Sequence, residues 1–478
     1  MATTTDSMGL YRTLWRWHFY AALFVIPIVV VLSITGSIYL FKPQLDRLQE
    51  ASVVRAAERP EAAASGAPRI VTADGRRDAV LQAYPGWTFQ YYRLPERAGD
   101  PVVIRIAEPT GRQRLDVLVG DDGSVLGAIG KDDWWSEWVS RLHGELLTGD
   151  AGSLVVEMAA NWAIVMILTG LYLWWPRGRG PAGVLWPRVR DGGIVWRDWH
   201  AVAGFWVSGA VLVLLVSGLP WTGVWGDGFK RVRAEMGWDG RSQDWQTSRQ
   251  AERQQATDEH AHHDGSSASS NAAGSSPSGG ATPSQDPTGA LPLSHFVEQA
   301  RALAMAHPVI VTPPGGPKRF GRGAETVWAI RSDSQNRTLR TTVRLDPDSG
   351  RELSRETFGD QHVIDRVIGY GISWHEGQLF GTINITAGLL TASGLLMLVV
   401  TGTVMWFRRS RHRAGLGAPP PTLDARLPRR MFIAAAVSCL LLPLLAVSAG
   451  VLWVLERVLL RRVPGVASWL GLALHDHR

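Results

Sequence analysis

Uncharged apolar runs alternate with polar stretches along the chain. Each of five runs is long enough to cross a hydrocarbon core of roughly 30 Å at a helical rise of roughly 1.5 Å per residue. The runs cover residues 19–41, 153–175, 201–225, 382–407 and 432–455. The pattern therefore predicts a multi-pass membrane protein with five transmembrane helices.

The first run follows Arg12 and Arg16, much as the apolar core of a secretory signal follows basic residues. It is longer than such a core, and the stretch FKPQL at its end offers no small-residue cleavage site. We expect this helix to stay in the protein as an anchor.

Arginine is concentrated in two of the segments between the runs. Five arginines lie in residues 176–198 and seven in residues 408–430, which marks both segments as cytoplasmic. The N-terminus is then also cytoplasmic, and the polar segments at about 42–152 and 227–381 lie outside the cytoplasm. The net charge of +6 largely reflects this bias, and no pattern of basic and stacking residues indicates a nucleic-acid partner.

Each outer segment contains a short helical pattern followed by strand patterns. Residues 77–87 predict a helix, and FQYYRLPE, PVVIRIAE and LDVLVGDDGSVLG predict strands and a hairpin around Asp-Gly. Residues 295–307 predict a second helix, followed by strands around TVWAIRS and LRTTVRLDPDSGREL. We predict two small α+β domains, with a disordered linker at 247–290 because that stretch is rich in Ser, Gly, Gln, Ala and Pro.

The chemistry available to the chain is limited by its single cysteine, Cys439, which lies in the fifth run. One cysteine excludes an intramolecular disulfide, a Cys-rich metal site and a covalently attached c-type haem. No Ser/His/Asp arrangement, P-loop or zinc motif of the H-E-x-x-H type supports a hydrolase. Metal chemistry in this chain must therefore use histidine or oxygen ligands.

Two histidines recur at matched positions where apolar runs begin. His18 in TLWRWHFYAALFVIP aligns with His200 in VWRDWHAVAGFWVSG. Gly36 follows the first and Gly218 the second, each after 18 residues, which is five helical turns and places each glycine on the face of its histidine.

A second matched pair is His143 in SRLHGELLTGDAG and His375 in ISWHEGQLFGTIN. Both precede Gly-containing breaks, which favours short outer helices separate from the spans. The dipeptides Thr169-Gly170 and Thr401-Gly402 follow at equal spacing. These matches indicate an internal duplication whose halves pack about a pseudo-twofold axis. His18 is then expected near His200 on the cytoplasmic side, and His143 near His375 on the outer side.

The fold class that follows is an α-helical transmembrane bundle of two tandem repeats plus one extra helix, with two small α+β extracytoplasmic domains. The predicted segments are helix 1 at 9–41, the first outer domain at 42–142, an outer turn and helix 2 at 143–175, a cytoplasmic loop at 176–198, helix 3 at 199–225, the second outer domain at 226–374, an outer turn and helix 4 at 375–407, a second cytoplasmic loop at 408–430, helix 5 at 431–455 and a tail at 456–478.

The order and spacing of these motifs resemble the PepSY-associated transmembrane helix family, which includes iron-regulated bacterial inner-membrane proteins and siderophore reductases. The resemblance covers roughly residues 9–410. It rests on WRWH at the first helix, the LHGELLTG and WHEGQLFG turns, the WWPR exit, and the DGSVLG and DPDSGREL hairpins. The second repeat departs from the first at Trp374, where the first has Leu142, and helix 5 lies outside the matched part.

This resemblance implies a di-haem b protein of the bacterial inner membrane with PepSY-like domains in the periplasm. It would be an oxidoreductase that carries electrons across the membrane and reduces ferric siderophores, its substrates. The axial ligands of the two haem irons would be His18, His200, His143 and His375. No flavin or nicotinamide module is visible, so the electron donor would be a separate cytoplasmic flavoprotein or a membrane quinol.

Several alternatives stay open at the level of sequence. The carboxylates Asp198, Glu145 and Glu376 lie near the histidines, but their partners are unassigned, and His362 is the best substitute ligand. The glycines that follow each histidine either admit a porphyrin edge or allow close helix packing. Trp134, Trp135 and Trp138 are candidates for an apolar outer surface. His260, His262, His263, His475 and His477 lie in the linker and tail, where we expect at most adventitious metal binding.

Two other functions compete with siderophore reduction. One is a non-redox membrane scaffold whose outer domains bind a peptidase or another partner, with structural histidines. The other keeps the haems and uses a different periplasmic acceptor, such as a copper or sulfur compound. Haem content separates the scaffold from the redox functions, and acceptor assays separate the two redox functions.

Overall fold

The computed structural model describes residues 2–57, 71–111, 113–176, 183–188, 194–238, 291–318, 324–411, 415–419 and 428–472. The predicted linker at 247–290, with His260, His262 and His263, lies outside these residues, as do His475 and His477. The chain forms two compact units. We name residues 1–40, 139–233 and 380–478 the membrane unit, and residues 41–138 and 234–379 the sheet unit.

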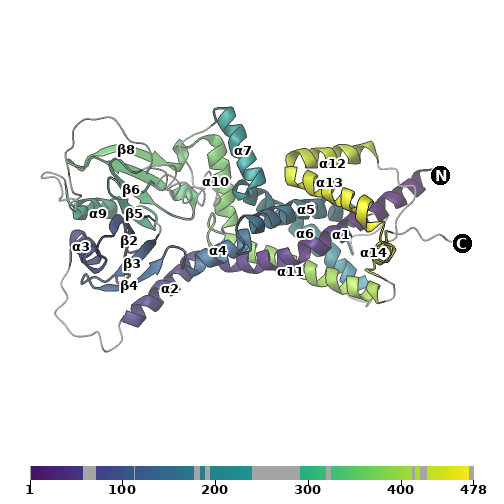
Figure 1. Ribbon diagram of the computed structural model, residues 1–478, viewed down its shortest axis with the longest axis horizontal. Coiled ribbons are helices and arrows are strands. Elements are labelled where there is room, and N and C mark those ends of the chain that lie inside the picture. Colours follow the sequence, from purple (N-terminus) through teal and green to yellow (C-terminus); the bar gives the residue numbers. More distant parts are fainter. Residues whose placement is uncertain are drawn as a thin grey trace, which may run out of the picture. The chain divides into compact units, whose positions relative to one another are not determined.

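Five helices of the described chain are long and apolar enough to span a membrane, as the hydropathy pattern predicts. Four of them are α1 (Ala2–Tyr39), α5 (Asp150–Trp174), α6 (Ile194–Gly218) and α11 (Thr382–Ser410). Helix α1 packs against α5 and α11, and α6 packs against the same two helices (Figure 1). The four spans therefore form a bundle in which α1 and α6 lie on one diagonal.

The fifth apolar run differs from the expected single helix at 431–455. It forms two helices, α12 (Arg429–Leu441) and α13 (Pro443–Leu455), which pack against each other (Figure 1). The break falls at Leu442, which has non-helical backbone angles, because a residue before proline is disfavoured in helical conformation and Pro443 has no N–H to donate. The fifth candidate span is Pro443–Leu460, which continues from α13 through a π-helical turn at Glu456–Leu460. The described chain then adds the short helix α14 (Pro464–Trp469).

Polar contacts attach this pair of helices to the bundle. Trp162 of α5 donates from Nε1 to the Ser448 hydroxyl at 3.2 Å, and Trp225 donates to the Leu441 carbonyl at 3.0 Å. Glu157, fully buried in α5, accepts the backbone N–H groups of Val224 and Trp225 at 2.9 Å each. These N–H groups begin α7 (Val224–Glu235), so a carboxylate inside the bundle caps this helix and fixes the position of Trp225.

The sheet unit contains the two predicted α+β patterns in the expected order. The first has α3 (Ala73–Ala83) and strands β1 (Thr88–Arg93), β2 (Val102–Ala107), β3 (Arg114–Val119) and β4 (Val125–Gly130). The second has α9 (Leu293–Ala302) and strands β5 (Val309–Thr312), β6 (Trp328–Ser332), β7 (Thr341–Leu345) and β8 (Glu352–Thr357). Neighbouring strands within each pattern pair antiparallel, as hairpin connections require.

The two patterns are joined, which the expectation of two separate domains did not include. Strands β1 and β5 pair antiparallel, with Tyr92 opposite Val311, and give one open eight-stranded sheet of order β4-β3-β2-β1-β5-β6-β7-β8 (Figure 1). Helices α3 and α9 share one apolar core with the sheet, including Phe296, Ile104 and Ile330. The pairing has a physical reason, because each half alone would leave its first strand as an unprotected edge.

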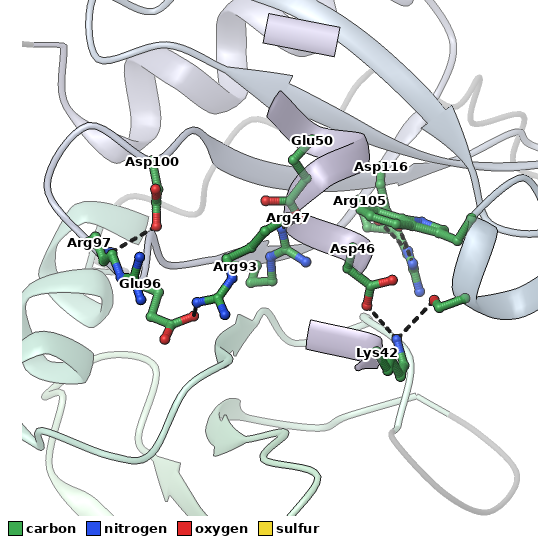
Figure 2. A network of polar contacts seen from close by, with 12 residues as sticks. Lys42, Asp46, Arg47, Glu50, Arg93, Glu96, Arg97, Asp100, Arg105 and Asp116 are labelled. Atoms are coloured by element: carbon green, nitrogen blue, oxygen red, sulfur yellow. Dashed lines mark hydrogen bonds and ion pairs between the residues drawn. The ribbon is translucent and has the colours of Figure 1, made fainter. Parts of the chain in front are cut away.

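Helix α2 (Lys42–Ala57) is tied to the first half of the sheet by charged side chains (Figure 2). Arg93 of β1 forms an ion pair with Glu50 of α2. Arg105 donates from Nε to Asp116 at 2.7 Å, and Asp116 also accepts the Trp134 indole N–H at 2.9 Å. Arg93 and Arg105 on this sheet face therefore each have a carboxylate partner.

Candidate functional site

Two imidazoles meet across the bundle, at the end where α1 and α6 carry the WRWH and WRDWH stretches. The ring centroids of His18 in α1 and His200 in α6 lie 6.5 Å apart, and their planes are nearly perpendicular at 88°. These helices occupy opposite corners of the bundle, so the rings approach each other across its interior. Both histidines are half-buried. The structure thus brings together the first predicted histidine pair.

His18 is held by the Thr169-Gly170 dipeptide of α5. Its Nδ1 lies 3.1 Å from the Thr169 hydroxyl. A Cβ atom added to Gly170 would come within 3.1 Å of His18 Cε1, so the absence of a side chain allows the ring to lie against the helix backbone.

His200 has the same environment at the opposite corner of the bundle. Its Nδ1 lies 3.0 Å from the hydroxyl of Thr401 in α11, and a Cβ atom on Gly402 would lie 3.4 Å from its Cε1. A threonine contact and a glycine contact therefore fix each ring of this pair. Both contacts join helices that neighbour each other in the bundle.

His143 repeats this arrangement at the other end of α1. It belongs to α4 (Trp135–Glu145), which is separate from the span α5, as the glycine-containing break predicts. Its Nδ1 lies 2.9 Å from the Thr35 hydroxyl, and a Cβ atom on Gly36 would lie 3.2 Å from its Cε1. Three of the four predicted histidines thus contact a Thr-Gly dipeptide on a span.

His375 ends α10 (Val363–His375), which also precedes a span. It belongs to the sheet unit, whereas His143 belongs to the membrane unit, so the pairing of these two histidines stays a prediction. The backbone around α10 is anchored locally, because the Ser373 hydroxyl accepts the Arg337 N–H at 3.0 Å.

Two of the carboxylates near the histidines have arginine partners. Asp198, buried at the start of α6, accepts from Arg188 at 2.6 and 3.0 Å and from Arg197 at 3.2 Å. Glu376 accepts from Arg337 at 2.9 Å. The imidazole partners found in the structure are threonine hydroxyls, which the sequence reasoning missed. The signal for two of these partners is the Thr-Gly dipeptide that recurs at equal spacing after His143 and His375.

The structure gives other sequence candidates local roles. His362 is the N-cap of α10, where its Nδ1 accepts the Ile364 N–H at 3.3 Å, and it is therefore a poor substitute ligand. Trp134 is buried and bonded to Asp116, so it does not contribute to an exposed apolar surface, whereas Trp135 and Trp138 are exposed.

The described residues contain no group of three or more His, Cys, Asp or Glu side chains placed to hold a metal ion. The histidine pair is therefore a two-ligand arrangement within the chain as described.

These features define a class, a multi-pass membrane protein whose span bundle carries histidines at both ends and whose other unit contains an antiparallel sheet packed against helices. A family profile described as the PepSY-associated TM region matches residues 15–409, and the chain belongs to this family. No curated protein sequence matches the chain.

Proposed function

We propose that the protein is an electron-transfer protein of a bacterial inner membrane that binds haem b and reduces ferric siderophores on the periplasmic side. The observation that supports this most is the approach of the His18 and His200 rings across the interior of the bundle. In this proposal His18 and His200 are the axial ligands of one haem iron, and His143 and His375 are those of a second.

The donor set and its spacing fit a haem. A nitrogen–metal bond is about 2 Å, and a ring nitrogen lies about 1 Å from the imidazole centre, so two axial ligands of one metal have ring centres about 6 Å apart. The observed separation of 6.5 Å agrees with this value. The glycines Gly170 and Gly402 allow both rings to lie close to the spans.

The bound group would supply a one-electron carrier that cycles between ferric and ferrous iron. Ligation by His18 and His200 would fill both axial positions, which favours electron transfer over oxygen binding. The helices that carry and contact the two rings are apolar spans, which limit the access of water. In this proposal the chain would supply the ligands and a water-poor environment for such a carrier.

The depths of His18 and His143 along α1 differ by nearly the thickness of a bilayer, so the two proposed haems would lie near opposite membrane surfaces. His18 and Thr35, the partner of His143, are separated by 17 residues of α1. At a rise of about 1.5 Å per residue, the two levels are about 26 Å apart along the helix, close to the hydrocarbon thickness of about 30 Å.

Basic residues support a cytoplasmic position for the His18 end. Arg409 lies over the Trp15 ring at 5.0 Å, Arg408 lies over Trp196 at 5.7 Å, and Arg197 pairs with Asp198. Arginine concentrated at one end of the spans follows the positive-inside rule. The N-terminus is then cytoplasmic, and the sheet unit is periplasmic.

The proposed electron acceptor, a ferric siderophore, follows from the resemblance to siderophore reductases. A separate cytoplasmic flavoprotein or a membrane quinol would supply one electron for each ferric ion reduced. Ferrous iron carries less charge and is softer, so it binds hard oxygen chelators more weakly and is released.

The test of this acceptor uses haem-loaded protein in detergent, reduced without oxygen and mixed with the ferric complex of desferrioxamine. We expect haem reoxidation, with one ferrous ion trapped by ferrozine for each electron lost. The gallium complex of the same chelator is the redox-inert control. Reoxidation by a cupric salt but not by ferric chelates would replace the siderophore with another acceptor.

A further inference from the structure

Threonine hydroxyls contact the same ring nitrogen in three of the four proposed ligands. Thr169, Thr401 and Thr35 lie 3.1, 3.0 and 2.9 Å from the Nδ1 atoms of His18, His200 and His143. All three threonines are buried. Each is followed by the glycine against which the imidazole lies.

The direction of these hydrogen bonds follows from the other bond that each threonine makes. The hydroxyls of Thr169, Thr401 and Thr35 lie 2.8, 2.8 and 2.7 Å from the backbone carbonyls four residues earlier in their helices. A carbonyl only accepts, and a hydroxyl has one proton, so each threonine donates to its own helix and accepts from the imidazole. The ring proton must then be on Nδ1.

We propose that Thr35, Thr169 and Thr401 are positioning residues that hold His143, His18 and His200 in the Nδ1–H tautomer and leave Nε2 unprotonated for a metal. The metal part of this inference rests on the proposed haem function, whereas the tautomer follows from contacts within the chain. A hydrogen-bond acceptor for the ring nitrogen that does not bind the metal orients a ligating histidine and makes the ligating nitrogen more basic.

The Thr-Gly dipeptide provides a hydrogen-bond acceptor and space for the imidazole at one position on a helix. The hydroxyl fixes the ring proton on Nδ1 and orients the ring, and the glycine, which has no Cβ atom, lets the ring lie against the helix backbone. The matching position in the third span is Ser217-Gly218, which keeps a hydroxyl before the glycine. Its hydroxyl also donates to its own helix, at 3.1 Å from the Leu214 carbonyl.

The first test uses haem-free protein in lipid, with isotope-labelled histidine and solid-state nitrogen NMR, which separates the two neutral tautomers. The His200 signal is assigned by its loss in His200→Ala. We expect the Nδ1–H tautomer for His200 in the wild-type protein. An Nε2–H tautomer would overturn the inference, whether or not the protein binds haem.

The second test compares Thr401→Val, which removes the acceptor at nearly constant shape, with Thr401→Ser, which keeps it. We expect Thr401→Val to weaken haem binding about tenfold and to raise the midpoint potential, because a less basic ligand stabilises ferric iron less. Thr401→Ser should restore both values. Equal affinity and potential in wild type and Thr401→Val would refute a positioning role, and failure of wild type to bind haem would refute the proposed function instead.

Discussion

The close approach of His18 to Gly170 predicts the effect of one added methyl group. In Gly170→Ala the new Cβ would lie 3.1 Å from His18 Cε1, about half an ångström inside an ordinary carbon contact. The ring or the span must shift, and overpacking of this kind costs about 1 to 3 kcal/mol. The same substitution improves helix propensity by up to about 1 kcal/mol, so a control must carry that gain alone.

Gly209→Ala is this control, because Gly209 also lies within a span, and a Cβ atom there would meet nothing within 4 Å. We expect Gly170→Ala to be less stable than Gly209→Ala by about 1 to 3 kcal/mol, measured by equilibrium unfolding in detergent with tryptophan fluorescence. Haem binding should weaken in Gly170→Ala only. Equal stability of the two variants would show that His18 does not pack against Gly170 as described.

Three further substitutions test other parts of the structure. Asp74 accepts the Leu293 and Ser294 N–H groups at 2.9 Å each, so Asp74→Ala should cost about 1 kcal/mol and speed hydrogen exchange at the start of α9; unchanged exchange would contradict this capping role. Asn161 is fully buried, and its two side-chain amide atoms have no hydrogen-bond partner among the described residues, so Asn161→Leu should stabilise the protein by about 1 to 3 kcal/mol; a lower unfolding temperature would indicate a polar ligand of this amide. Burial raises the pKa of Tyr91, so the neutral phenol contributes fully to the free energy of unfolding below the ordinary tyrosine pKa of about 10, and this contribution is lost as pH rises further. Tyr91→Phe should therefore unfold less at alkaline pH, as followed by near-ultraviolet circular dichroism. Identical curves for the two proteins would show that Tyr91 ionisation does not cause the alkaline unfolding.

The apolar pattern was sufficient for four spans but not for the fifth run. Hydropathy measures side chains, whereas the break between α12 and α13 arises from the backbone at Pro443. The proline inside the apolar run is therefore the local signal of the break.

The strand pattern predicted both halves of the sheet but not their union. Period-two alternation shows which face of a strand is buried, and it carries no information on which edges pair. The pairing of Tyr92 with Val311 joins segments separated by more than 200 residues and by the segment 247–290. Only the three-dimensional structure supplies that contact.

The candidate site was predicted in part for a similar reason. Repetition along the chain identified His18, His200 and His143, since equal spacing is visible in one dimension. The hydrogen-bond partners of His18 and His200 come from neighbouring spans, and Thr169 lies 151 residues after His18. A search for acceptors near each histidine in sequence found Asp198 instead, whose charge is matched by Arg188 and Arg197.

The central claim, that these histidines hold haem, is tested most directly by the haem content of three purified proteins from haem-replete cells. Wild type should contain about two haems per chain, the number that four axial histidines allow, with sharp low-spin b-type bands after dithionite reduction. His200→Ala should lose one haem, and His362→Asn, which keeps a capping side chain on α10, should lose none. A colourless wild-type protein, or His200→Ala with full haem content, would contradict the account.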